Sequence, residues 1–124
     1  MANQIDYNIN LDVKYAPLEL IDVPQVVAEN TKQWFNQTLT AVNESVVRIG
    51  IVEGEFHWHK HDDDDEFFFV LSGKLYIDVE NHETIELEPN RGVTIPKGVM
   101  HRPRAPHKTV MLMVETNGIK PTGD

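Results

Sequence analysis

Hydrophobic and polar residues alternate in short runs along most of the chain after residue 37. The runs are rich in β-branched and aromatic residues, and glycine, proline and asparagine separate them. This pattern is typical of short β-strands. We expect strands at residues 38–42, 46–52, 56–61, 66–71, 74–79, 83–87, 93–95, 99–102 and 109–115. About eight or nine evenly spaced strands predict an all-β fold, a closed barrel or a jelly-roll sandwich, with room inside for one small ligand.

The first third of the chain has a weaker pattern. Apolar residues alternate with polar ones at Ile5, Tyr7, Ile9, Leu11 and Val13. This alternation predicts an extended arm or an edge strand. The arm has more apolar surface than a free tail needs, so we expect it to pair two copies of the chain into a homodimer. From Pro24 to about Phe35 the spacing fits a short helix better than a strand, with Pro24 in its first turn.

Length and charge limit the classes of function. The 124 residues fit one domain, in which we expect an arm and helix at 1–35, a barrel at 36–116 and a tail at 117–124. The net charge of −9, without a lysine or arginine cluster, argues against nucleic-acid and membrane partners. No apolar segment approaches the roughly 20 residues that span a bilayer, and residues 1–4 do not resemble a signal peptide. We therefore expect a cytoplasmic protein.

Histidines cluster in one of the expected strands. Residues two apart in a strand face the same side, so His57, His59 and His61 are expected on one face. Glu66 follows across a short acidic loop and opens the next strand, and His101 follows a tight turn later in the chain. Because the chain has no cysteine, a metal site must use nitrogen and oxygen ligands. Histidines of one strand face, a carboxylate and a further imidazole are suited to bind one divalent ion.

Two segments around these residues resemble the two sequence motifs of the cupin family. The first reads His59-x-His61-x4-Glu66-x6-Gly73, and the second runs from Gly92 through Pro96 and Gly98 to His101. The resemblance covers about residues 50–115, and the tail is similar to the ends of small single-domain cupins that are loosely labelled mannose-6-phosphate-isomerase-like. It implies a cupin-type β-barrel, or jelly roll, in which His59, His61, Glu66 and His101 bind the metal.

Three positions depart from the family pattern. Gly54 stands one residue closer to the first ligand histidine, Ala105 replaces an asparagine, and Gly92 lies nearer to Pro96 than in the fullest form of the motif. None of these positions is a ligand. The implied set of three histidines and one glutamate suits Mn, Fe, Co, Ni, Cu or Zn. On a metal that accepts five or six ligands it leaves positions for water, substrate or dioxygen, as catalytic sites do.

The cupin motifs define the family and say little about the reaction. We expect a metal-dependent enzyme that acts on a small polar molecule, such as a sugar derivative or an organic acid. Its chemistry would be that of a Lewis-acid isomerase or lyase, or of an oxygenase. The alternative is a non-catalytic binding or sensing module in which the metal anchors a ligand. A second acid–base group beside the metal would favour the enzyme, and an all-apolar pocket would favour the binder.

His57 and Arg48 are further candidates for a role in the site. His57 shares the parity of the ligand histidines, so it is expected to point into the barrel. Either His57 and His59 or His59 and His61 chelate the metal, and the motif favours the second pair. His57 would then be a proton carrier for catalysis or a hydrogen-bonded core histidine. Arg48 either meets an anionic substrate or, as we expect, faces solvent.

Overall fold

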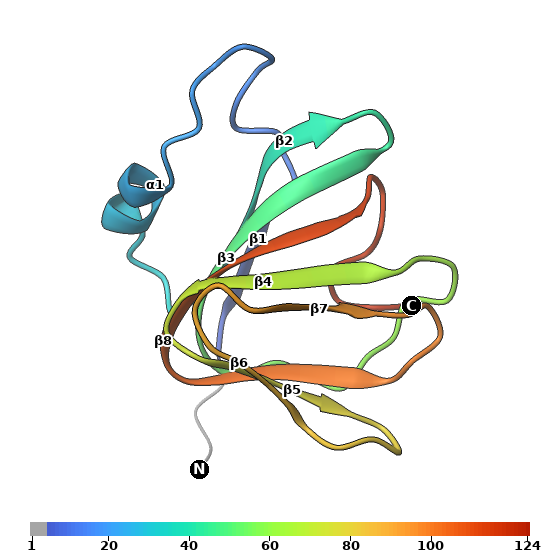
Figure 1. Cartoon of the computed structure of the whole chain (residues 1–124). Coiled ribbons are helices and arrows are strands. Elements are labelled where there is room, and N and C mark those ends of the chain that lie inside the picture. Colours follow the sequence, from blue (N-terminus) through green and yellow to red (C-terminus); the bar gives the residue numbers. More distant parts are fainter. Residues whose placement is uncertain (1–4) are drawn as a thin grey trace.

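A computed structural model describes residues 5–124 of the chain, and its regular structure is almost entirely β (Figure 1). The strands are β1 (Tyr7–Asn10), β2 (Trp34–Val42), β3 (Ser45–Glu55), β4 (Glu66–Ser72), β5 (Leu75–Val79), β6 (Ile85–Leu87), β7 (Gly92–Ile95) and β8 (His101–Thr116). One short helix, α1, spans Val23–Glu29. The prediction of an all-β fold with a short helix is confirmed. With seven residues, α1 is too short to cross a membrane, and the described part of the chain has no longer helix.

The long strand β8 holds the two halves of the fold together. The sheet runs in the order β1-β2-β3-β8-β4-β7, and β5 joins it through β8 while β6 pairs with β5. Residues 101–104 of β8 pair with β5, and residues 109–116 pair with β3 and, in part, with β4. Figure 1 shows β8 bending between these two parts, orange and then red. Within residues 5–124 the strand pairing does not close on itself, so the fold is a jelly-roll sandwich rather than a continuous barrel.

The alternation of side chains along β2, β3 and β8 creates an inner face. Cross-strand pairing aligns Asn36 with Gly50 and Gly50 with Met111, so these three residues form one row. The adjoining rows place Trp34 beside Val52, and the face packs against β4, β5 and β7. This interior contains the larger hydrophobic core, and its open end holds the candidate site described below.

The opposite face of the same strands is also buried. Ile49, Ile51 and Leu39 are almost fully inaccessible and pack with Val26 of α1. Burying each such aliphatic side chain contributes roughly 1.5–3 kcal/mol. Because α1 covers this outer face, β3 has apolar side chains on both sides.

The helix begins as predicted but ends earlier. The Asp22 side chain accepts a hydrogen bond from the Gln25 backbone N–H, and Pro24 lies in the first turn. The chain leaves the helix at Asn30, which is extended, and Trp34 already belongs to β2. The expected helix to Phe35 was therefore wrong at its end, because Trp34 and Phe35 pack on opposite faces of a strand.

Two further expectations about the strands are corrected. Residues 56–61 do not form a strand; an isolated bridge joins His59 to His101, and further backbone hydrogen bonds tie Phe56, Lys60 and His61 to other segments. The pairing of β3 with β8 shifts its register between Val52 and Gly54, where Gly54 has a φ of 114°, and β3 ends at Glu55, just before this segment. Residues 99–102 and 109–115, expected as separate strands, belong largely to one strand, β8.

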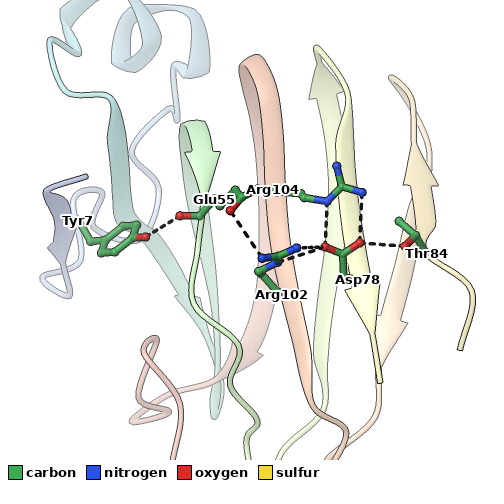
Figure 2. Close-up of polar contacts among 6 residues, drawn as sticks. All are labelled: Tyr7, Glu55, Asp78, Thr84, Arg102 and Arg104. Atoms are coloured by element: carbon green, nitrogen blue, oxygen red, sulfur yellow. Dashed lines mark hydrogen bonds and ion pairs between the residues drawn. The ribbon is translucent and has the colours of Figure 1, made fainter. Parts of the chain in front are cut away.

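A network of polar side chains lies where β5 and β8 pair (Figure 2). The Asp78 carboxylate accepts hydrogen bonds from the guanidinium groups of both Arg102 and Arg104, and from the Thr84 hydroxyl. Arg102 also lies 3.6 Å from the Glu55 carboxylate. The network joins strands from distant parts of the sequence outside the apolar core.

Candidate metal centre

Four side chains from three segments of the chain converge at the open end of the sandwich. Glu66 is the first residue of β4 and His101 the first of β8, whereas His59 and His61 lie in the segment between β3 and β4. Backbone hydrogen bonds in both directions join His59 and His101, with N···O distances of 3.0 and 2.8 Å. All four side chains are buried. One potential ligand atom from each of them lies within 4.8 Å of the other three.

The cluster surrounds the Glu66 carboxylate. Oε1 of Glu66 lies 3.5 Å from Nε2 of His61 and 3.4 Å from Nε2 of His101. The imidazole rings of His59 and His101 have their centroids 4.3 Å apart. Three imidazoles and one carboxylate therefore face a common point, which is the donor set that first-row transition metals bind.

Backbone carbonyl groups hold two of the rings in the tautomer that a metal requires. Nδ1 of His59 donates to the carbonyl of His57 at 3.0 Å, and Nδ1 of His101 donates to the carbonyl of Val99 at 2.9 Å. With the proton on Nδ1, the Nε2 lone pair of each ring is free to face the cluster. Metal-binding histidines are usually fixed in this way by a hydrogen bond from the other ring nitrogen.

Several atoms of the cluster are buried without a hydrogen-bond partner. They include Nε2 of His61, Nε2 of His101 and Oε1 of Glu66. An unsatisfied buried polar atom costs about 1–3 kcal/mol, and more when it is charged. The unshared lone pairs point toward one another, so a cation between them would satisfy all three atoms. The residues present thus fit a divalent transition metal.

The electrostatics of the cluster favour the protonation state of a metal site. Burial lowers the pKa of His59 to about 4, which keeps this imidazole neutral at physiological pH. Burial alone would raise the pKa of Glu66, but the neighbouring imidazoles of His101 and His61 outweigh it and hold the pKa well below its usual range. Neutral imidazoles and an ionised carboxylate are the forms that bind metals.

A buried ion pair lies next to the cluster. Arg48 and Glu115 pair on the inner face, both almost inaccessible, and Nη1 of Arg48 donates to the Thr38 hydroxyl at 2.9 Å. Glu115 also contacts Glu66; burial and this neighbouring carboxylate raise its pKa, while Arg48 opposes the rise. The expectation that Arg48 faces solvent was wrong, and the sequence analysis did not identify Glu115. Arg48 lies on the same face of β3 as Gly50 and Val52.

His57 does not point into the sandwich. Its side chain is exposed, and Nε2 donates to the Thr122 carbonyl of the C-terminal tail at 2.7 Å. The ring still stacks on Phe56 and has its centroid 5.4 Å from that of His59. The expected inward orientation was wrong because this segment is not a strand. A role for His57 in proton transfer stays a prediction.

Comparisons with known proteins agree with the fold and the cluster. Residues 46–116, more than half of the chain, match the cupin domain family, so this chain belongs to that family. All four residues of the cluster lie inside the match. The chain is 45% identical over 80 residues to Uncharacterized protein YdbB of Bacillus subtilis (strain 168), a match that covers 64% of this chain and 71% of that protein.

Solved structures share the same architecture. A cupin-2 domain containing protein from Shewanella frigidimarina NCIMB 400 has 31% sequence identity and a TM-score of 0.74, over 78% of this chain and 94% of the other. A chain from the structures of the DMSP lyases RdDddP and RnDddQII has 21% identity and a TM-score of 0.54, over 62% of this chain and 40% of the other. At that identity the likeness concerns the fold alone. The predicted cupin-type jelly roll is confirmed.

Proposed function

We propose that this cupin is a metal-dependent enzyme in which His59, His61, Glu66 and His101 hold one divalent transition metal. The observation that carries the proposal is the buried set of donor atoms, all within 4.8 Å of one another and several without any other partner. A structural core would not retain three imidazoles and a carboxylate in this state, because each unsatisfied atom destabilises the fold. A bound metal would supply Lewis acidity, which polarises a substrate oxygen.

The residues around the cluster have defined tasks in such an enzyme. His57 and Val99 fix the rings of His59 and His101 through their carbonyl groups, so the donor atoms are oriented before the metal binds. Phe56 and other apolar side chains line the adjoining cavity and exclude water. The geometry therefore supports a preorganised, partly dry site that remains open to a small molecule.

The proposed chemistry is that of a Lewis-acid isomerase or lyase, or of an oxygenase that uses the same donor set. The fold is shared with structures of DMSP lyases, so a lyase reaction is compatible with the scaffold. A second candidate function is a non-catalytic module that binds or senses a small molecule. The aromatic and methionine side chains in the cavity wall favour it.

Metal analysis of the full chain, purified without an affinity-tag metal, tests the proposal. We expect about one equivalent of a transition metal, and none after His61→Ala. The matched control is His82→Ala, which removes an exposed histidine whose ring hydrogen-bonds the Glu83 carbonyl. Equal metal content in both variants would refute the metal centre. A substrate screen with the loaded protein then separates the two functions, because turnover supports the enzyme and binding without turnover supports the sensor.

We also propose that the protein acts as a homodimer in the cytoplasm. The lack of cysteine and the strongly acidic composition support the compartment. Part of the N-terminal arm is covered by its own chain, since β1 pairs with β2 and Tyr7 packs against Trp34 and Phe56. Leu11, Val13, Leu18 and Leu20 stay exposed, and this apolar surface supports contact with a second copy.

A further inference from the structure

A small cavity lies directly beside the candidate metal centre. Its volume is about 30 Å³, and His59 and Glu66 form part of its wall. That volume accommodates about two water-sized groups. A molecule bound at the cluster would therefore extend a short part of its structure, and no more, into this cavity.

The rest of the wall is uncharged and largely apolar. Three aromatic side chains, Trp34, Phe56 and Phe68, and the methionines Met111 and Met113 line it. None of the described residues that line the cavity is a lysine or an arginine. A phosphate or second carboxylate in this cavity would lose its hydration without meeting a cation, which is strongly unfavourable. The cavity thus suits an uncharged group.

One polar side chain other than the candidate ligands interrupts this apolar wall. Asn36 lines the cavity, only 8% of its surface is exposed, and its Oδ1 has no hydrogen-bond partner among residues 5–124. Native structures rarely leave a buried amide oxygen unpaired, and such exceptions call for an explanation. Its neighbour across the strand pair is Gly50, and the space that a side chain there would take is occupied by Met111 and Met113.

Charge balance at the cluster adds a second constraint. Three neutral histidines and the Glu66 carboxylate would leave one positive charge on a site that holds a divalent metal. A ligand with a single negative charge neutralises this site, whereas a dianion or trianion leaves excess charge in a buried region.

We infer that the site binds a small monocarboxylate with a short uncharged tail, and that Oδ1 of Asn36 accepts a hydrogen bond from a hydroxyl group on that tail. This inference rests on the proposed metal centre and names the class of ligand that it takes. The tail enters the cavity, where Met111 and Met113 adapt to its shape because their side chains are flexible. Asn36 thereby determines specificity and takes no part in holding the metal.

Calorimetric titration of the zinc-loaded full chain tests this inference. The probes are butyrate, 3-hydroxybutyrate and 3-phosphoglycerate. We expect 3-hydroxybutyrate to bind roughly tenfold more tightly than butyrate, the effect of one buried hydrogen bond, and 3-phosphoglycerate to bind much more weakly than either. The Asn36→Leu variant should bind zinc normally and lose the preference for the hydroxyl group.

Stability distinguishes a ligand-binding amide from a structural one. If Asn36 serves the ligand, Asn36→Leu removes an unpaired polar group and the urea midpoint of the free protein does not fall. Gly50→Ala provides an independent variant, because its Cβ would lie 2.8 Å from Cε of Met111 and press the methionines into the cavity. This change should weaken the binding of butyrate more than the binding of acetate, while zinc binding persists.

The outcomes separate the two proposals. Failure to bind zinc would refute the metal centre and, with it, the ligand inference. Zinc binding with no response to the monocarboxylates, or with equal affinity for 3-phosphoglycerate, would overturn the ligand inference alone. If Asn36→Leu lost much of its stability and kept the preference for the hydroxyl group, Asn36 would be a structural residue. That result would also overturn the ligand inference.

Discussion

Replacement of Asp78 by asparagine should destabilise the protein in a pH-dependent way. In the network of Figure 2 the Asp78 carboxylate accepts four hydrogen bonds from Arg102 and Arg104, between 2.8 and 3.2 Å long. Its side chain is only 12% exposed, whereas those of the two arginines are 27% and 30% exposed. The Asp78→Asn variant keeps the shape of the side chain but removes its charge and turns one acceptor into a donor.

The expected loss follows from the difference between charged and neutral hydrogen bonds. Bonds to a charged group contribute about 1.5–3 kcal/mol and neutral ones about 0.5–1.5 kcal/mol. Each arginine therefore loses about 1 kcal/mol of interaction with residue 78. The loss is no larger because the guanidinium groups are partly exposed, so water replaces the rest of their hydrogen bonding. We expect a loss of about 2 kcal/mol at pH 7, which corresponds to a fall in Tm of about 8 °C for a chain of this size.

The pH dependence has a definite sign. Hydrogen bonds from Arg104, opposed by partial burial and reinforced by Arg102, hold the pKa of Asp78 well below its usual value of 3.8. Stability contributed by such a carboxyl is fully present above 3.8 and is lost as the pH falls toward the lowered pKa. The gap in stability between the wild type and Asp78→Asn should therefore be constant from pH 7 to pH 5 and narrow by pH 3.

Denaturation in urea, with thermal melts at each pH, measures these differences. Asp63→Asn removes a charge from the exposed acidic loop and should change stability by less than about 0.5 kcal/mol. Thr84→Val removes the hydrogen bond that the Thr84 hydroxyl donates to the charged Asp78 carboxylate, and it should lower the free energy of unfolding by about 1.5–3 kcal/mol with little pH dependence above pH 5. If Asp78→Asn were as stable as Asp63→Asn, or if its cost were the same at pH 3 as at pH 7, the electrostatic argument would be refuted.

Four further predictions concern the metal, the backbone and the assembly. His57→Ala should retain the metal in elemental analysis and His59→Ala should lose it; loss from both would mean that the ligand register is wrong. Gly73→Ala and Gly98→Ala both place a side chain at positive φ, at a cost of about 1–2 kcal/mol. In chemical denaturation, Gly73→Ala should lose at least about 2 kcal/mol more unfolding free energy than Gly98→Ala. The new Cβ at residue 73 would lie 2.6 Å from the Lys108 carbonyl oxygen, whereas a Cβ at residue 98 would have no described atom within 4 Å. Equal losses in the two variants would contradict this close approach. Bound metal should dissociate as the pH falls through about 6, where released imidazoles gain protons, and equilibrium dialysis that shows pH-independent retention would contradict this. Light scattering should give about twice the chain mass of 14.2 kDa, whereas a value equal to it would exclude the dimer.

The sequence predicted the cluster better than it predicted the surroundings. Spacing and family motifs identified His59, His61, Glu66 and His101, which the structure brings together. The parity argument placed His57 incorrectly because it assumed a continuous strand. Strand β3 ends at Glu55, and the alternating side chains of residues 56–61 do not reveal that end.

The buried residues of the inner face illustrate a second limit. On β3 one set of alternate residues packs in the core and the other packs under α1, so both sets are largely apolar. Alternation then does not tell which face a polar residue such as Arg48 occupies. Its partner Glu115 lies in β8, 67 positions along the chain, and only the pairing of β3 with β8 brings the two together.

The position of β8 in the sheet has a consequence for how the protein folds. This strand, residues 101–116, pairs with β3, β4 and β5, all of which precede it in the sequence. Until β8 has been synthesised, β4 and β5 lack their main partner, and the end of the sandwich that carries Glu66 cannot assemble. Pairings between such distant segments make a high contact order, for which folding times of milliseconds to seconds are usual. Metal capture must therefore come late in folding, after β8 has docked and placed His101 opposite His59.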